Sequence, residues 1–567
     1  MSIKVVAKST GKVTNFMGST NYRLNPILTL KIVSSSSLFG EPMYYIAGRN
    51  HNSYLSTFVD EDSTVPEEYR IIGELYNQPA QNSAQILERI IDRALDYDFD
   101  ATLEWARTLR KDFYIRLTPQ VIMVRASIHP GRKDYTTKYP GKFAKINQLV
   151  MSRADEPASQ LKYWNAIKGE KSAKGIPPIL RRSWKTRLEN CFPREVNKYG
   201  NSEFVDVVRV SHANNPSIDK LLRNEKVISE IELATWEQLK SEGKSWDEII
   251  HTIKMGHMAI LRNLRGMILS DIGMDALEEV LNILIKTAPT GKQMPYRYYS
   301  AYKEVSNLDM SKAKVPLDEA KVEIQKEKAK HAISECLDIV VSQLPRLKGR
   351  VVALSDNSGS AYGTSVSEKS SMRINIVDNL SAMIAASRGD SGRVVIFGDR
   401  IHIFEYDPNK SIIEQTFALN ALSTADIGLS TETGIWTYLG KAILKDEHMD
   451  HLFIYSDQQA GYSKLYGTHT YLKEEFTEAE FNTLCGLLEI NAEGYMHHFE
   501  LIKFVNAYRT LVNPRVNIST IQTAGYDNSI FPETLYRTNV LYGWTGKEIE
   551  YHAILADIWD TIDEVRN

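Results

Sequence analysis

The sequence predicts a multidomain protein in which a long α-solenoid is followed by an α/β domain with a doubly wound sheet. Between residues 65 and 347, amphipathic helices follow one another with short connections, which is typical of helical repeats. From residue 348 to 567, short apolar runs alternate with helical patterns, as in an open parallel sheet. Residues 1–64 are β-like instead, so three segments are expected.

The composition fits a globular protein of this size. The 567 residues, with 43% hydrophobic and 25% charged side chains, suffice for about three average domains. Three widely spaced cysteines form neither a disulfide framework nor a zinc cluster. No signal-peptide pattern or long apolar run is present. We therefore expect a cytoplasmic protein with no membrane contact.

The net charge of -3 conceals a strong asymmetry along the chain. Residues 101–200 contain 21 Lys and Arg against 8 Asp and Glu, whereas the remainder contains 47 against 63. Such a split predicts one region that binds a polyanion beside an acidic remainder. A solvated helical surface that happens to be basic is the alternative.

The first two segments are expected to contain a hairpin and then helices. The runs 27–33 and 42–47, separated by a Ser-rich turn, predict a β-hairpin. Apolar residues at helical spacing then predict successive helices, although no fixed sequence period is found. These helices are expected at 82–95, 98–111, 118–128, 178–198, 202–212, 226–243, 246–267 and 272–288.

The third segment is expected to alternate strands and helices. Apolar runs predict six strands, at 350–355, 393–397, 401–406, 451–456, 516–524 and 539–543. Helices are expected at 372–387, 433–445 and 546–565, with an additional helical segment at 462–512.

Three strand-end loops of this segment carry oxygen side chains. Asp356, Ser358 and Ser360 follow the first strand, Asp457 follows the run 451–456, and Thr431 lies in Gly428–Gly434 between them. Ligands of open α/β sheets bind outside the carboxyl ends of the strands, and hydroxyls with carboxylates suit a hard cation. We expect a divalent cation there, Mg²⁺ first and Mn²⁺ or Ca²⁺ as alternatives. A serine-rich, N-capping turn is the competing interpretation.

These residues resemble the metal-ion-dependent adhesion site (MIDAS) of von Willebrand factor A domains, a Rossmann-like fold. The resemblance implies that the two serines and the threonine ligate the metal, while the aspartates act mostly through water. Leu429 and Ser430 stand where a glycine pair is usual, which leaves the choice between Thr431 and Thr433 open.

Several stretches of the helical half, in their order, resemble the Ro ribonucleoprotein family, whose helical part is the TROVE module. They include Arg181–Arg187, Arg194–Tyr199, Phe204–His212, Met258–Met267 and Pro295–Tyr302. The resemblance implies a ring of HEAT-like repeats closed by the A domain. It also implies small non-coding RNA (Y RNA) on the outer surface, 3′ ends of misfolded RNA in a central hole, and a role in RNA quality control. An exoribonuclease tethered through the RNA is an expected partner of a monomeric protein.

The resemblance carries two family RNA contacts onto Lys198 and His212. We add the neighbouring cations Lys185, Arg187 and Arg209 to this outer surface, because phosphate contacts dominate RNA affinity. For the hole we expect three arginines among apolar or aromatic residues, namely Arg262, Arg265 and Arg297. The alternative is that these arginines only bridge helices to acids such as Glu304.

Three classes of function follow from these features. An RNA-binding scaffold without enzymatic activity uses the charge split, the helical motifs and the cation site together. A metal-dependent hydrolase would need a poised base, and the sequence offers no Ser/His/Asp set, H-E-x-x-H or P-loop. A protein-binding adhesion module would leave the basic residues 101–200 unused. We therefore expect the scaffold and assign no catalytic residue.

Overall fold

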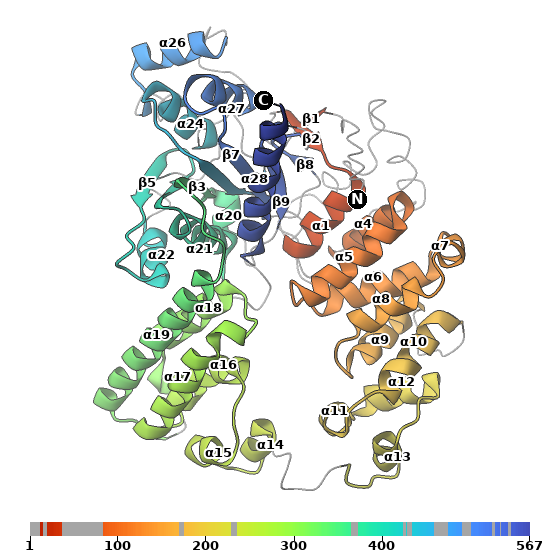
Figure 1. The fold of residues 1–567 in the computed structure, drawn as a ribbon. Helices are drawn as coiled ribbons and strands as arrows, with labels where there is room; N and C mark the ends of the chain where they lie inside the picture. The colour runs from red at the N-terminus through yellow and green to blue at the C-terminus, as the bar shows by residue number, and fades with distance from the viewer. Residues whose placement is uncertain are drawn as a thin grey trace. The chain divides into compact units, whose positions relative to one another are not determined.

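The computed structural model describes residues 12–14, 20–36, 83–168, 175–227, 235–313, 315–363, 372–422, 427, 434–458, 475–489, 501–523, 528–532, 535–542 and 546–566. The chain forms two compact units. The helical unit is drawn from residues 26–41 and 51–244, and the sheet unit is drawn from residues 1–25, 42–50 and 245–567. Each unit is described separately below (Figure 1).

Amphipathic helices build the helical unit, as their periodicity predicts. The apolar face of the first long helix is buried, with Leu87, Ile90, Ile91 and Leu95 at most 2% exposed. Successive helices then pack on their neighbours, α5 on α6 and α8, α6 on α9, and α10 on α8 and α12 (Figure 1). The helices are α1 (Pro26–Ser36), α4 (Ser83–Tyr97), α5 (Phe99–Lys111), α6 (Leu117–Ile128), α7 (Arg132–Lys138), α8 (Lys142–Val150), α9 (Glu156–Lys168), α10 (Pro178–Glu189), α11 (Pro193–Tyr199), α12 (Ser202–Ser211), α13 (Pro216–Leu222) and α14 (Trp236–Ser241).

The prediction of a hairpin at residues 27–47 is wrong for its first strand. Residues 27–33 lie within helix α1, which packs on α4 and α5. Ser34 joins this packing, since its hydroxyl donates to the Leu30 carbonyl and accepts from the Trp105 indole at 2.8 Å. A short apolar run cannot distinguish a strand from a buried helix, and tertiary packing decides here. Residues 42–47 lie outside the described residues.

Two of the expected helices are each two helices. Pro193 opens α11, and the extended backbone of Phe192 before it ends the run predicted at 178–198. The run predicted at 246–267 is interrupted where Ile253 turns extended and Gly256 caps the next helix. Of the helix expected at 226–243 the structure describes α14, and residues 228–234 lie outside it. The sheet unit thus contains the helices α15 (Trp246–Thr252), α16 (His257–Ile268), α17 (Met274–Thr287), α18 (Pro295–Ser306) and α19 (Glu319–Ser342).

All six strands expected after residue 348 are present in one sheet. Its order is β5-β4-β3-β6-β7-β9, and all neighbours are parallel except β4 and β5. The central strands are buried along nearly their whole length, which explains their continuous apolar runs. The strands are β3 (Arg350–Asp356), β4 (Ser391–Phe397), β5 (Ile401–Glu405), β6 (His451–Ser456), β7 (Asn517–Gln522) and β9 (Thr538–Tyr542).

Helices cover this sheet, as a doubly wound fold requires. One core joins Val352, Leu354 and Ile454 of the strands to Trp436 and Phe504 of two helices. A small second sheet pairs β1 (Lys12–Thr14) with β2 (Thr20–Arg23), and β2 with β8 (Asn528–Ser529), so an N-terminal hairpin exists earlier than expected. The helices of this region are α20 (Gly359–Gly363), α21 (Ile374–Ser387), α22 (Ile412–Asn420), α24 (Gly434–Leu444), α26 (Glu478–Leu487), α27 (Leu501–Leu511) and α28 (Lys547–Arg566).

The three cysteines are free thiols inside the protein. Burial raises the pKa of Cys191 to about 11 and that of Cys336 to about 12, so neither thiol ionises readily near neutral pH. Within the described ranges, every helix is too short or too polar to cross a bilayer.

A directed chain of hydrogen bonds ties α28 to the sheet. His451 Nε2 lies 3.1 Å from the Lys348 carbonyl, which only accepts, so this nitrogen carries the proton. His451 Nδ1 therefore accepts from His552 Nε2 at 2.8 Å, and His552 Nδ1 accepts from the Ser519 hydroxyl at 2.6 Å. Burial lowers the pKa of both imidazoles, and that of His552 falls well below its ordinary value. Both histidines are neutral in the folded protein.

Acidification is expected to destabilise the sheet unit through this pair. Because the folded pKa values are depressed, the unfolded chain alone takes up protons as the pH falls below about 6.5, and the free energy of unfolding decreases. His552→Gln should flatten this dependence, measured as urea midpoints by near-UV circular dichroism at about pH 7.5 and pH 5.5. His331→Gln, at an 81% exposed side chain, is the control and should behave as wild type. An equal loss of stability in His552→Gln and wild type would contradict the assignment.

Candidate functional site

The loops after β3 and β6 bring the expected oxygen side chains together at the carboxyl edge of the sheet. The strand order reverses between these two neighbours, which is where ligands bind in doubly wound folds. Asp356, Ser358 and Asp457 lie at this edge, which we call the crevice, and are at most 2% exposed. Ser360 belongs to α20, but its side chain is not described, and Thr431 lies outside the described residues. The structure therefore assembles three of the five expected residues.

Asp356 is the centre of this group. Its Oδ1 accepts the Ser358 backbone N–H at 2.9 Å, and its Oδ2 accepts the Ser456 hydroxyl at 3.1 Å. Burial raises the pKa of Asp356, while the hydrogen bonds from Ser358, Ser456 and the Asp457 backbone oppose that rise. The loop after β3 is thus shaped around a carboxylate that stays removed from water.

A further carboxylate, Asp378 of α21, belongs to the same crevice and was missed in the sequence. Its Oδ2 accepts the Thr523 hydroxyl at 3.1 Å, whereas its buried Oδ1 has no hydrogen-bond partner among the described residues. Burial first, and then the charges of Asp356 and Asp457, raise the pKa of Asp378 well above its ordinary value. The available signal was a lone acid in the otherwise apolar helix pattern 374–387, where a charge needs a reason to be buried.

This arrangement fits a hard cation. A buried oxygen without a partner and several mutually repelling carboxyl groups are stabilised by a positive charge or by protons. The carboxyl groups and the Ser358 hydroxyl are the donor types that Mg²⁺ and Mn²⁺ prefer. Among the residues that the structure describes, three or more His, Cys, Asp or Glu side chains nowhere form a metal cluster by themselves. A cation here would depend on hydroxyl ligands and water as well as carboxylates.

Side-chain amides hydrogen-bond to one another beside the loop after β3. Asn357 Nδ2 donates to Asn379 Oδ1 at 2.8 Å, and Asn379 Nδ2 returns a bond to Asn357 Oδ1 at 3.0 Å. Asn379 Nδ2 also donates to Asn420 Oδ1 at 2.6 Å, and Asn420 Nδ2 donates to the Tyr299 hydroxyl at 3.0 Å. One continuous polar chain therefore joins the loop after β3 to helix α18.

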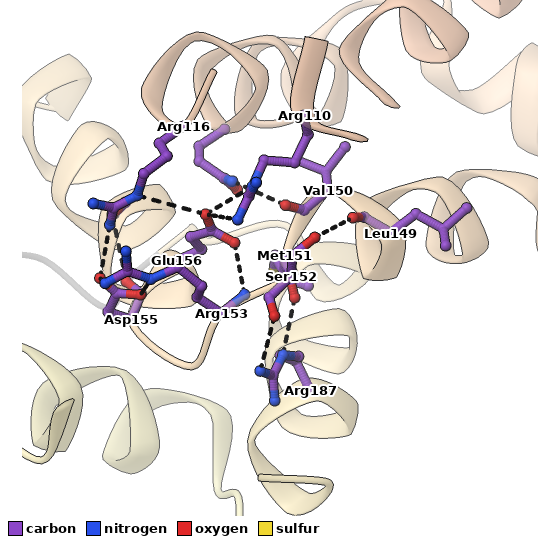
Figure 2. A network of polar contacts seen from close by, with 12 residues as sticks. Arg110, Arg116, Leu149, Val150, Met151, Ser152, Arg153, Asp155, Glu156 and Arg187 are labelled. Carbon is purple, nitrogen blue, oxygen red and sulfur yellow. Dashed lines mark hydrogen bonds and ion pairs between the residues drawn. The ribbon is translucent and has the colours of Figure 1, made fainter. Parts of the chain in front are cut away.

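In the helical unit, Arg187 is engaged inside the protein. Its Nε donates to the Met151 carbonyl at 2.9 Å, and its Nη2 donates to the Ser152 carbonyl at 3.3 Å (Figure 2). Nη2 also donates to Glu195 at 2.5 Å. An RNA contact from this guanidinium would have to replace these bonds. It stays a prediction.

Figure 2 shows that further arginines form ion pairs at the turn between α8 and α9. Glu156 is 1% exposed and accepts Arg110 Nε and the Arg153 backbone N–H, each at 2.8 Å. Asp155 pairs with Arg116 at 2.8 Å and with Arg153 at 2.9 Å. Burial raises the pKa of Glu156, and the Arg110 charge acts against that rise. Much of the positive charge here is neutralised within the fold.

The other expected outer-surface residues are exposed. Lys185 pairs with Glu189 of the same helix at 3.7 Å. Lys198 ends α11, with Nζ 5.7 Å from the centre of the Tyr199 ring. Arg209 lies in the last turn of α12, and His212 caps that helix with a left-handed φ of 53°. Within the described chain, Lys198, Arg209 and His212 form no ion pair, so they are available to an anionic ligand.

The three arginines expected at the hole have different surroundings. Arg262 is exposed, and Arg297 is exposed with its guanidinium 5.6 Å from the Tyr296 ring. Arg265 donates to Glu304 at 2.8 Å, which is the bridging alternative. The interleaved tyrosines differ from expectation as well, since two of them are buried in the protein. Tyr298 meets His257 Nε2 at 2.8 Å, and Tyr299 stacks on Phe417 with ring centres 4.7 Å apart. Those two rings cannot stack on bases.

The fold and these sites define a helical-repeat protein that also carries a doubly wound sheet with an acidic crevice. A family model of the TROVE domain matches residues 230–358, which run from the end of the helical unit to the crevice loop. The crystal structure of the Ro (RSR) protein of Deinococcus radiodurans aligns with 94% of this chain and 99% of that chain, with a TM-score of 0.51 and 10% identity. No curated protein matches the chain.

The expected resemblance to the Ro ribonucleoprotein family is thereby confirmed by a matching TROVE segment and a shared fold. The predicted fold class, helical repeats followed by a von Willebrand A-like α/β domain, is confirmed as well. At 10% identity the structural likeness shows the fold alone, so the ligands have to be argued from the residues of this chain.

Proposed function

We propose that this protein is an RNA-binding scaffold of the Ro type, which binds small structured non-coding RNA through its helical unit. The observation that carries the proposal is the set of exposed cations on α11 and α12 that have no carboxylate partner among the residues the structure describes. Phosphate neutralisation supplies much of RNA affinity, and cations that already pair inside the protein cannot contribute to it. A His at a helix end can also donate to phosphates or base edges. We assign no catalytic role to these residues.

Removal of these cations should weaken RNA binding without unfolding the protein. In fluorescence anisotropy with a small hairpin RNA, Lys198→Ala with Arg209→Ala should lower the slope of log affinity against log salt by roughly two, and His212→Ser should weaken binding further. Lys162→Ala is the control, because this exposed lysine already pairs with Glu203 at 3.3 Å. Arg187→Ala should instead lower the free energy of unfolding by about 1–3 kcal/mol, since it leaves buried carbonyls unpaired. Wild-type affinity and slope in both the Lys198→Ala with Arg209→Ala variant and the His212→Ser variant would exclude this surface.

We extend the proposal to single-stranded RNA. A 3′ end of a misfolded RNA passes the exposed Arg262 and Arg297 in a central opening, which gives the protein a role in RNA quality control in the cytoplasm. An exoribonuclease is engaged through the same RNA, and the protein acts as a monomer. The free guanidinium of Arg297 beside Tyr296 supports this assignment, because arginine and aromatic side chains together bind single strands without base preference.

An RNA with a single-stranded 3′ tail should then bind more tightly than the same RNA with a blunt end. The difference should shrink in the double variant Arg262→Ala with Arg297→Ala, because both cations neutralise tail phosphates. Arg265→Ala tests the alternative, since its pairing with Glu304 predicts a change in stability and little change in tail preference. Equal anisotropy-derived affinities for tailed and blunt RNA in the wild type would sink the assignment.

We also propose that the crevice binds one divalent cation. Ser358 and Ser360, together with Thr431 from the neighbouring loop, hold it, while Asp356, Asp378 and Asp457 supply negative charge directly or through water. When bound, the cation would present a positive site to a carboxylate of a partner molecule. The unpartnered Oδ1 of Asp378 supports the proposal, because burial of such an atom without compensation is costly.

Two substitutions in the crevice should weaken cation binding, and one of them should also stabilise the cation-free protein. Asp356→Asn should abolish binding of Mg²⁺ or Mn²⁺ in calorimetry. Asp378→Asn should raise the free energy of unfolding of the cation-free protein by about 1–3 kcal/mol, because it removes a buried repelled charge, and should reduce the rise in Tm caused by Mg²⁺. Asp134→Asn on α7, an exposed acid, is the control. Equal cation binding by wild type and both crevice variants would refute the site.

A further inference from the structure

A cavity of about 750 Å³ opens between α7, α8 and α10 of the helical unit. We call it the α7–α8–α10 groove. The three helices lie close together in Figure 1, and α10 packs directly on α8. None of its lining residues belongs to α11 or α12, so the groove is separate from the surface that carries Lys198, Arg209 and His212. One turn and three helices line it, with the residues Arg132, Lys133, Thr136, Pro140, Gly141, Phe143, Ala144, Lys145, Gln148, Pro178, Ile179, Arg182, Ser183 and Thr186.

The charge of this groove is of one sign. Arg132, Lys133, Lys145 and Arg182 line it, and no Asp or Glu does. None of the four forms an ion pair with a carboxylate in the part of the chain described, whereas Arg110, Arg116 and Arg153 at the nearby turn all do (Figure 2). Four cations that face one cavity repel one another, so the groove favours an anionic ligand.

Two helix N-termini add backbone donors to the same cavity. Helix α8 starts after Gly141, whose left-handed φ of 78° turns the chain, and α10 starts with Pro178 after Pro177. Neither cap residue supplies a side-chain acceptor. The first-turn N–H groups of Phe143, Ala144 and Ile179 therefore lack an intrahelical partner, and all three residues line the groove. Such N–H groups and the helix dipole bind anions, phosphate above all.

An independent observation comes from Ser183. This residue is 2% exposed, lines the groove, and has a hydroxyl for which the described part of the chain offers no hydrogen-bond partner. Its backbone carbonyl is already used, because it accepts Gln148 Nε2 at 2.6 Å. A buried hydroxyl that is left unpaired is unusual in a folded protein and indicates a ligand that completes it.

We propose that the α7–α8–α10 groove binds consecutive phosphates of a single RNA strand, without reading the bases. This inference rests on the proposed RNA-binding function and names a second site for it. The only aromatic ring in the lining is Phe143, which is 1% exposed, so no base can stack there. A mononucleotide would find no aromatic ring for its base there. The sugar-phosphate backbone of an RNA strand needs only cations and N–H donors. The groove therefore adds affinity that is independent of sequence.

The test uses the full chain and two single-stranded 20-nucleotide probes, oligouridylate and oligoadenylate, in anisotropy titrations over a series of salt concentrations. Lys145→Ala with Arg182→Ala should weaken both probes by the same factor, at least about tenfold, and lower the salt slope by about 1.4. The charge-retaining variant Lys145→Arg with Arg182→Lys should keep the wild-type slope. Lys162→Ala, whose charge is already paired with Glu203, is the matched control and should leave both probes unchanged.

The outcomes separate this inference from the proposed function. If Lys198→Ala weakens hairpin RNA while the groove variant binds both probes as wild type does, the groove assignment fails and the proposed function stands. Loss of only one probe would show base reading and would also overturn it. Two competition experiments at matched ionic strength would also overturn the inference. Displacement of the probe by millimolar inorganic phosphate would identify free phosphate as the ligand. Displacement by polyglutamate as effectively as by unlabelled RNA would identify an acidic polypeptide as the ligand.

Discussion

The ion pair between Glu156 and Arg110 fixes the turn between α8 and α9, on which the arrangement of the helical unit depends. A carboxylate that is 1% exposed survives burial only with charged donors, and Arg110 with the Arg153 backbone supplies them. Other acids of this region pair with Arg187 and Lys142, namely Glu195, Asp100 and Glu104. Among the described residues, the four cations of the α7–α8–α10 groove have no carboxylate partner. The ion pairs inside the helical unit thus determine which of its cations remain available to a polyanion.

The sheet unit uses the opposite sign of charge at its crevice. Asp356, Asp378 and Asp457 are brought together where the strand order reverses, and the charges of Asp356 and Asp457 add to burial in raising the pKa of Asp378. A protein selected for stability alone would not keep an unpartnered buried oxygen at Asp378, so the crevice is strained in favour of a ligand. The amide chain through Asn357, Asn379 and Asn420 to Tyr299 gives the crevice loop a rigid backing. It also places a helix of the TROVE-matched segment in hydrogen-bond contact with that backing.

Strand positions were predictable because a buried parallel strand is apolar along most of its length and is followed by a polar loop, as β3 is after Asp356. Helix boundaries were predictable where a cap or proline marks them, and wrong where one apolar period continued across Pro193 or Gly256. Residues 27–33 illustrate the harder case, since the same apolar run suits a strand or a buried helix. Arg265 illustrates another, because only the position of Glu304 on α18 decides that its charge is used inside the protein.

By itself the sequence determined the helical and the α/β class of the two long segments, three of the loop residues that meet at the sheet edge, and the basic character of residues 101–200. These properties depend on local periodicity and composition, which do not depend on which residues become neighbours in the folded protein. The tertiary structure decided which charges are free. It buried Tyr298 and Tyr299, engaged Arg187 and added Asp378 to the crevice. Among the described residues, it also left four cations of the α7–α8–α10 groove without a carboxylate partner. Pairing and burial join residues far apart in the chain, so no local pattern contains them.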